Sequence, residues 1–84
     1  MADLNADFEA AVANSKKLAQ RPDNTTLLKI YGLYKQATLG DNPEKKPGFG
    51  DMIGRAKWEA WNGFKGTSSD EAKQQYIALI QSLS

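Results

Sequence analysis

Two tyrosines and two lysines are spaced so that they could recognise an anionic ligand that carries a ring. Tyr31, Tyr34 and Lys35 are three or four residues apart, so on a helical wheel of about 100° per residue they share one side. Lys57 falls among the aromatic residues of its own stretch, where an ammonium group needs either an anionic partner or a path along its stem to water. This set predicts binding of an anionic, ring-bearing molecule with an apolar tail.

The composition excludes several classes of protein. The chain has 84 residues and contains neither cysteine nor histidine. A chain of this length forms one domain, here residues 1–84, with a single core. Without these two residue types, disulfides, thiol catalysis, the commonest metal ligands and the usual general base near neutral pH are all missing. We therefore expect a protein that is not an enzyme, with no cofactor and no metal site.

Charge and hydropathy limit the classes of partner and the cellular location that we expect. Eleven basic and ten acidic side chains leave a formal charge of +1, far from the basic excess of a nucleic-acid-binding module. Residues 1–5 lack the positive start and apolar run of a secretion signal. No apolar stretch approaches the roughly 20 residues that span a bilayer. We expect a cytoplasmic monomer that does not bind nucleic acid.

Apolar periodicity predicts two helices in the first half of the chain. The first is capped by Asn5 or Asp3, carries an apolar stripe from Phe8 to Leu18, and ends by Pro22. A second helix opens at Asp23 or Asn24 and stops at Gly40. Its apolar arc is unusually wide.

A long loop and two more helices follow. Residues 40–50 contain two prolines and three glycines, a pattern typical of an ordered loop. Loops of this length in compact domains are often functional. The third helix is predicted over about 51–65, although its two glycines weaken it by roughly 1 kcal/mol each. The fourth begins at the capping-box sequence of residues 68–71 and runs to Leu83.

These elements predict an all-α, four-helix bundle with a long loop between the second and third helices. Aromatic residues at helical spacing are, from pattern alone, more often core than ligand platform. For Trp58 both interpretations remain open, whereas for Trp61 we favour a core position. Packing between the first and last helices is assigned to Phe8, Val12, Leu18, Ile77, Ile80 and Leu83. Glu59 and Asp41 suit caps, ion pairs or turns better than catalysis.

Four ordered segments resemble the acyl-CoA-binding proteins. They are YGLYKQATLGD from Tyr31, KPG from Lys46, GRAKWEAWN from Gly54 and KGTS from Lys65. The resemblance runs from about Phe8 to Leu83 without an insertion. An isolated Tyr-x-x-Tyr-Lys motif would be weak evidence for this resemblance. The ordered set of four segments, with the lengths between them preserved, is specific.

The resemblance implies reversible binding, transport and pool buffering of long-chain fatty acyl-CoA thioesters, with no covalent chemistry. Enzymes that use acyl-CoA, or membranes, are then implied as transient donors and acceptors. Tyr31, Lys35 and Lys57 resemble the residues that hold the 3′-phosphate of the ribose, and Tyr34 resembles one that packs beside the adenine. The remaining implied contacts are Lys16 and Tyr76 for the coenzyme A head and Leu27, Leu28 and Met52 for the acyl chain.

A different function class is a small helical interaction module that uses the wide apolar arc of residues 27–38 to grip a partner helix. It accounts for the aromatic residues but not for the lysines. Three residues depart from the family pattern: Ser15 replaces an aliphatic residue, Gly50 a bulky apolar one, and Ile53 a polar or basic one. The last two lie by the expected acyl entrance, so they bear on chain-length preference.

Overall fold

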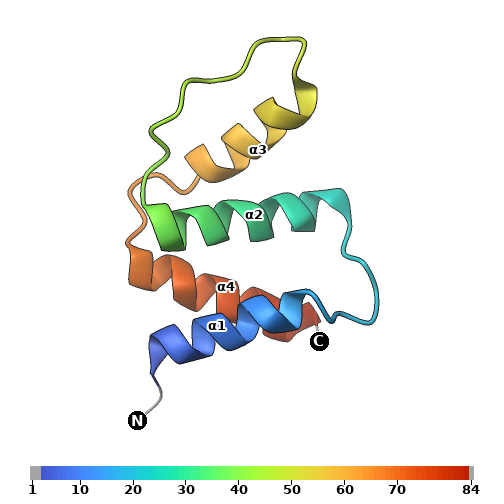
Figure 1. Ribbon diagram of the computed structural model, residues 1–84, viewed down its shortest axis with the longest axis vertical. Coiled ribbons are helices and arrows are strands. Elements are labelled where there is room, and N and C mark those ends of the chain that lie inside the picture. The colour runs from blue at the N-terminus through green and yellow to red at the C-terminus, as the bar shows by residue number, and fades with distance from the viewer. Residues whose placement is uncertain (1–2, 84) are drawn as a thin grey trace.

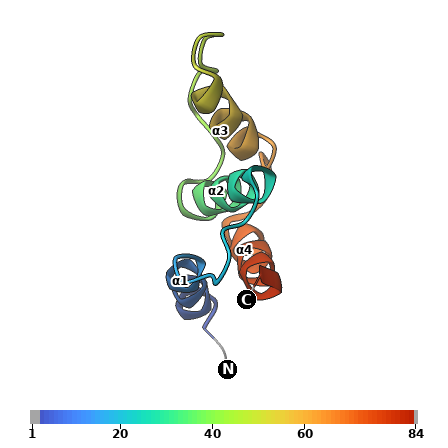
Figure 2. The same ribbon diagram turned by 90° about the vertical axis from the view of Figure 1, so that its right-hand side faces the viewer.

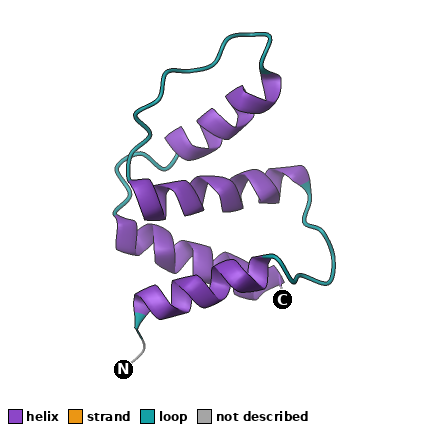
Figure 3. Cartoon of the chain, in the orientation of Figure 1, coloured by secondary structure: helices purple, strands orange, loops and turns teal. Residues whose placement is uncertain are grey.

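The structure, a computed structural model, describes residues 3–83 and is all-α, with no strand in that range (Figure 3). The predicted four-helix architecture is confirmed. The helices are α1 (Leu4–Ser15), α2 (Asn24–Leu39), α3 (Met52–Asn62) and α4 (Ser69–Leu83). No helix within these residues is long and apolar enough to cross a membrane.

The helices form a flat molecule in which α2 occupies the middle. Figure 1 shows α1 and α4 running in one direction and α2 and α3 in the other, and Figure 2 shows α1 and α3 on opposite sides of α2. The Cα atoms extend 44 × 29 × 14 Å. The helix pairs in contact are α2 with α4, α2 with α3, and α1 with α4. One side of α2, between α1 and α3, therefore has no helix packed directly on it.

Side-chain caps begin the helices where the sequence predicts. Asp3, rather than Asn5, caps α1 by accepting the Asn5 backbone N–H at 3.0 Å, and Asp23 caps α2 by accepting that of Thr26 at 2.8 Å. At the start of α4, Ser68 Oγ accepts the Glu71 N–H at 3.1 Å. Among the described residues no bond returns from the Glu71 carboxylate, so only half of the predicted capping box forms.

The first helix is shorter than predicted. It ends at Ser15, and Leu18 lies in the connection to α2, outside the helix and the core cluster. The backbone N–H of Lys16 bonds to the Ala13 carbonyl and that of Lys17 to Asn14, a tighter three-residue spacing that stops α-helical bonding. Ser15 Oγ also donates to the Val12 carbonyl at 2.6 Å. The prediction that the stripe continues to Leu18 was wrong because this turn intervenes.

The third helix also stops earlier than predicted, at Asn62 instead of residue 65. After Gly63, the N–H groups of Phe64 and Lys65 bond to carbonyls three residues back, at 3.0 and 3.1 Å. Gly66 then takes a φ of 90°, a conformation that glycine adopts without steric cost. This turn leads the chain directly into α4.

The core lies between α1, α2 and α4, and a glycine lets α3 approach α2. The buried cluster consists of Phe8, Ala11, Leu33, Ala37, Ala72, Tyr76 and Ile80, with Val12, Ile77 and Leu83 packed on it. Apart from Leu18, the residues predicted to join the first and last helices do so. On the other side, a Cβ on Gly32 would clash with the Ala60 carbonyl oxygen, so only glycine fits there. This close approach places α3 beside the uncovered side of α2.

Candidate functional site

Two ammonium groups from different helices meet over one tyrosine ring. Lys35 Nζ on α2 lies 5.7 Å from the centre of the Tyr31 ring, and Lys57 Nζ on α3 lies 5.6 Å from it. Such a position over a ring is favourable for a cation. The sequence left two alternatives for Lys57, an anionic partner or a path to water. Lys57 is exposed, so its stem carries the ammonium group to water. The structure thus brings together the three residues predicted to hold a phosphate.

Lys35 also lies beside a buried tryptophan. Its ammonium also lies 5.6 Å from the centre of the Trp61 ring, and Trp61 Nε1 donates to the Gly40 carbonyl at 2.8 Å. Trp61 is 2% exposed, which confirms its predicted core position. Within residues 3–83 neither Lys35 nor Lys57 pairs with a carboxylate. Two ammonium groups without a protein anion thus lie close to one ring, which favours binding of an anion.

An apolar pocket opens beside this pair of ammonium groups, between the first halves of α2 and α3. Its volume is about 470 Å³, and it is lined by Arg21, Asn24, Leu27, Leu28, Tyr31, Met52, Ile53, Ala56 and Lys57. Leu27, Leu28 and Met52 therefore line the same pocket. Since Tyr31 and Lys57 belong to both features, the cationic site and the apolar pocket are continuous.

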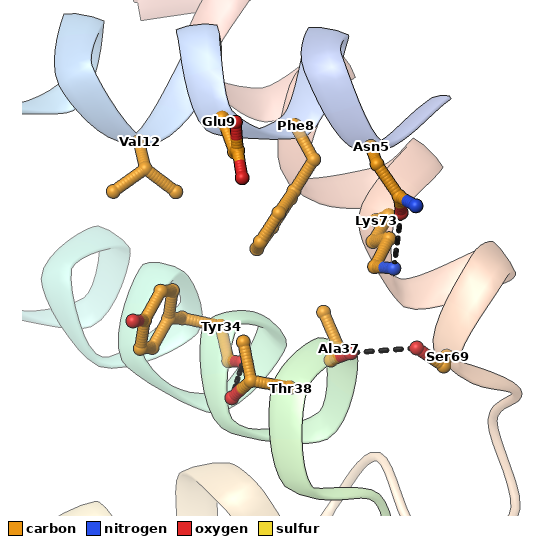
Figure 4. A pocket seen from close by; sticks show the side chains of 9 residues that line it. All are labelled: Asn5, Phe8, Glu9, Val12, Tyr34, Ala37, Thr38, Ser69 and Lys73. Atoms are coloured by element: carbon orange, nitrogen blue, oxygen red, sulfur yellow. Dashed lines mark hydrogen bonds between the residues drawn. The ribbon is translucent and has the colours of Figure 1, made fainter. Parts of the chain in front are cut away.

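A second cavity lies between α1, α2 and α4. It has a volume of about 590 Å³ and is lined by Asn5, Phe8, Glu9, Val12, Tyr34, Ala37, Thr38, Ser69 and Lys73. Figure 4 shows Phe8 projecting from α1 towards α2, from which Tyr34 projects. The two rings are 6.0 Å apart with an interplanar angle of 19°, and Tyr34 is 40% exposed. This cavity offers an exposed ring to a flat, aromatic group.

Polar bonds hold the walls of this cavity. Lys73 Nζ donates to Asn5 Oδ1 at 2.6 Å and joins α4 to α1, while Ser69 Oγ donates to the Ala37 carbonyl at 2.6 Å and joins α4 to α2 (Figure 4). The three helices are thus tied together around Tyr34.

The other two predicted contacts, Tyr76 and Lys16, occupy different surroundings. Tyr76 is 2% exposed, its ring 5.1 Å from that of Phe8 and 6.3 Å from that of Tyr34. Burial raises the pKa of the Tyr76 phenol, a hydrogen bond with Ser15 lowers it in part, and the neighbouring Tyr34 raises it. Lys16 is exposed in the turn after α1. The structure places neither residue beside the two ammonium groups.

The long loop 40–51 is ordered by contacts with α3, as predicted. Trp58 Nε1 donates to the Glu44 carbonyl at 2.7 Å, and Asn42 Nδ2 donates to the Trp58 carbonyl at 3.3 Å. Lys46 and Glu59 form an ion pair at 3.1 Å. Trp58 therefore fastens the loop to α3.

The carboxylates near the site have structural partners. Asp41 Oδ1 accepts the Gly66 N–H and the side-chain amide of Gln36, each at 2.9 Å, and these two bonds lower the Asp41 pKa. Glu59 is engaged with Lys46. Residues 3–83 contain no cluster of acidic side chains that could hold a metal ion. Both carboxylates have the turn and ion-pair roles expected of them.

Sequence reasoning missed several residues that line the two cavities. Arg21 from the connection before α2 and Asn24 from the first residue of α2 line the apolar pocket, and Lys73 and Glu9 line the cavity beside Tyr34. One local signal existed, because Lys73 precedes Tyr76 by three residues and so shares its side of α4. For Arg21 no local signal existed, since only the packing of α3 on α2 makes the connection before α2 part of a pocket.

Comparison with known proteins adds an independent line of observation. The family profile for Acyl CoA binding protein matches residues 5–80. An acyl-CoA-binding protein homolog of Drosophila melanogaster is 46% identical over 80 residues, which cover 95% of this chain and 93% of that relative. The acyl-CoA-binding protein of Saccharomyces cerevisiae is 46% identical over 76 residues, which cover 90% of this chain and 87% of that protein.

A solved structure shows the same fold. The crystal structure of Oryza sativa Acyl-CoA-Binding Protein 2 superimposes with a TM-score of 0.92 at 37% sequence identity, covering 96% of this chain and 90% of that one. The similarity in sequence and in helix arrangement therefore extends over nearly the whole chain.

Proposed function

Because the chain belongs to the acyl-CoA-binding protein family, we propose that it binds long-chain fatty acyl-CoA thioesters reversibly, and so carries and buffers them. The observation that carries the proposal is the meeting of two unpaired ammonium groups over Tyr31, at the edge of an apolar pocket. A thioester of coenzyme A has the matching parts, namely a phosphorylated nucleotide and an apolar chain.

The cationic site suits the 3′-phosphate of the ribose. The ammonium groups of Lys35 and Lys57 and the phenol of Tyr31 can surround a dianion with charge-assisted hydrogen bonds, each contributing about 1.5–3 kcal/mol net. Lysine supplies a rotatable point charge that adapts to the phosphate oxygens. This site therefore decides which class of molecule binds.

The pocket lined by Leu27, Leu28 and Met52 suits the start of the acyl chain. At about 0.8 kcal/mol per buried methylene, ten methylenes would contribute on the order of 8 kcal/mol before the cost of association is subtracted. Chain length therefore sets how tightly the ligand binds. The pocket is continuous with Tyr31 and Lys57, so one ligand can occupy both sites.

The exposed ring of Tyr34 suits the adenine. Purines stack on aromatic side chains with about 1–3 kcal/mol per base in nucleic-acid-binding proteins. Lys16 and Tyr76 complete the proposed set by contacting the head of coenzyme A. Since Tyr76 is 2% exposed, we expect its contribution to be the smaller of the two.

We further propose that the protein binds without covalent chemistry, as a cytoplasmic monomer that exchanges ligand with enzymes or membranes. The sequence has no histidine or cysteine to serve as base or thiol nucleophile. Incubation with palmitoyl-CoA should release free thiol no faster than the buffer blank. Release above the blank would show thioester hydrolysis and overturn this part of the proposal.

Calorimetric titration with palmitoyl-CoA tests the proposed function. We expect saturable binding that weakens strongly with the dephospho-CoA ester, because that ligand lacks the 3′-phosphate. Esters of graded chain length should bind more tightly as the chain grows, until the pocket is filled. No binding of palmitoyl-CoA would overturn the function, and equal affinity for the dephospho ester would overturn the phosphate site.

A further inference from the structure

Arg21 brings to the apolar pocket a positive charge that none of the proposed ligand contacts uses. It lies in the connection between α1 and α2 and lines the pocket together with Tyr31 and Lys57. Its side chain is exposed, and within residues 3–83 it forms no ion pair with a carboxylate. An exposed guanidinium beside a pocket is suited to an anionic ligand.

Carboxylates at the starts of α2 and α3 have other partners. None of the residues that line the pocket is acidic. The carboxylates of Asp23 and Asp51 accept backbone N–H groups in the first turns of α2 and α3, at 2.8 and 2.9 Å. Glu59 pairs with Lys46 at 3.1 Å and lines other cavities. The charge of Arg21 is therefore available to a ligand.

The backbone holds Arg21 close to the start of α2. Pro22 follows it, and the residue before a proline is restricted to extended conformations. Asp23 is then the cap of α2. Figure 1 shows that the connection before α2 and the start of α3 lie on the same side of the molecule. The guanidinium can therefore meet a ligand between α2 and α3 without rearrangement of the backbone.

Coenzyme A carries two anionic groups on one ribose. The 3′-phosphate has a proposed site between Lys35, Lys57 and Tyr31, whereas the 5′-diphosphate has none. Because both groups are attached to one sugar ring, the diphosphate of a bound ligand must lie close to the 3′-phosphate. Arg21 shares a pocket with Tyr31 and Lys57, so it lies in this region. Lys16, the other cation implied for the coenzyme A head, does not line the pocket.

We propose that the Arg21 guanidinium binds the 5′-diphosphate of coenzyme A. This site rests on the proposed function and deepens it by giving each anionic group its own contact. A guanidinium presents a planar fork of N–H donors that matches two phosphate oxygens at once, whereas a lysine supplies a point charge. Arginine therefore suits the diphosphate, which offers pairs of oxygens on adjacent phosphorus atoms.

Two contacts on one ribose fix its orientation. With the 3′-phosphate at Lys35 and Lys57 and the diphosphate at Arg21, the ribose cannot turn about either group alone. The pantetheine arm leaves from the diphosphate, at the rim of the pocket lined by Leu27 and Leu28. Arg21 thus directs the arm and the acyl chain towards this pocket and selects ligands that carry both anionic groups.

Calorimetric titration with two esters separates the two phosphate sites. Arg21→Gln should weaken binding of palmitoyl-CoA about tenfold, and binding of the dephospho-CoA ester by the same factor, because both ligands keep the diphosphate. Lys35→Ala should weaken binding of the intact ester only, because the dephospho ester lacks the 3′-phosphate. A loss in Arg21→Gln that is confined to the intact ester would place Arg21 at the 3′-phosphate and overturn the proposal.

Free coenzyme A tests whether Arg21 acts on the diphosphate or on the acyl chain. This ligand carries both anionic groups but no chain, so Arg21→Gln should weaken its binding by the same factor as that of palmitoyl-CoA. An unchanged affinity for free coenzyme A would show that the stem of Arg21 packs on the chain instead, and would overturn the proposal.

Matched variants control for net charge and for folding. Lys17→Gln removes an equal charge from the same connection, at a residue that lines neither cavity, and should bind palmitoyl-CoA like the parent. Arg21→Lys keeps the charge without the fork and should lose affinity about threefold. Urea unfolding of Arg21→Gln should match that of the parent, because Arg21 pairs with no carboxylate among the described residues. An equal loss of affinity in Lys17→Gln, or a destabilised Arg21→Gln, would overturn a direct contact.

The same titrations distinguish the diphosphate site from the proposed function. If the parent binds palmitoyl-CoA and Arg21→Gln binds both esters as the parent does, the function stands and the diphosphate site is wrong. If the parent does not bind palmitoyl-CoA, the proposed function fails and the diphosphate site falls with it.

Discussion

The two sides of α2 are formed by neighbouring residues but have different roles. Gly32, Leu33 and Gln36 are buried against the other helices, whereas Tyr31 and Lys35 face the space between α1 and α3. The buried side determines where α3 and α4 pack. The open side carries the Lys35 ammonium and the Tyr31 ring, Lys57 of α3 adds a second charge beside that ring, and neither ammonium pairs with a carboxylate within the described residues.

This difference indicates that stability and binding are separable on one helix. On the buried side, Gln36 Nε2 donates to Asp41 at 2.9 Å and to the Thr67 carbonyl at 2.8 Å, which fastens α2 to the turn before α4. On the open side, the groups contact one another only loosely and are free to meet a ligand. Substitutions on the two sides should therefore change different measured quantities.

The largest effect is expected on the buried side. Leu33 is fully buried, so Leu33→Ala should lower the free energy of unfolding by about 2–5 kcal/mol, through lost burial and the cavity that remains. Urea unfolding measures this change. Leu39→Ala at the exposed end of the same helix serves as the control and should change stability by less than about 0.5 kcal/mol. Equal effects would show that the two sides are not distinct.

The second-largest effect is expected for Tyr31 and Lys35 on the open side of α2 and for Lys57 on α3. Tyr31→Phe, Lys35→Ala and Lys57→Ala should each weaken binding of palmitoyl-CoA by about 1.5–3 kcal/mol, because each removes a bond to the phosphate. Urea unfolding should be nearly unchanged.

The control for these three variants is Lys29→Ala, which removes an exposed cation of α2 that lines a different cavity. It should bind like the parent in calorimetry. If all three site variants also bind like the parent, the site assignment is wrong even though the family is right.

A smaller effect is expected for Tyr76, which is a predicted ligand contact but lies in the core. Tyr76→Phe keeps the buried ring and removes a hydroxyl whose interaction with Ser15 lowers the Tyr76 pKa in part, so unfolding should become easier by about 0.5–1.5 kcal/mol. Its effect on palmitoyl-CoA affinity should be smaller than that of Tyr31→Phe. A larger loss of affinity than in Tyr31→Phe would show that the ligand reaches the core.

The smallest effect concerns pH. Hydrogen bonds from the Gly66 N–H and the Gln36 amide lower the folded-state pKa of Asp41 below the ordinary value of 3.8. The stabilisation is therefore complete above that value and is lost as the pH falls through the lower, folded-state pKa. Urea unfolding of Asp41→Asn should show a weaker loss of stability in this acid range than the parent. An unchanged acid profile would mean that other carboxylates account for it.

Local signals predicted the helices well and their ends less well. Asp23 and Ser68 cap helices as expected because a side-chain oxygen and a backbone N–H a few residues later are close in any fold. The ends of α1 and α3 were missed because tight turns at residues 16–17 and 63–66 compete with α-helical bonding over small differences in energy. Apolar spacing at Leu18 gave no sign of that competition.

By itself, the sequence determined the number and approximate limits of the helices, the absence of histidine and cysteine chemistry, and the family resemblance. Only the tertiary structure decided that Lys57 meets Lys35 over Tyr31, that Tyr76 is in the core, and that Met52 lines a pocket. The physical reason is the sequence distance over which each kind of interaction acts. Caps and helical periodicity act within a few residues, whereas contacts between helices depend on packing, such as the close approach of α3 at Gly32.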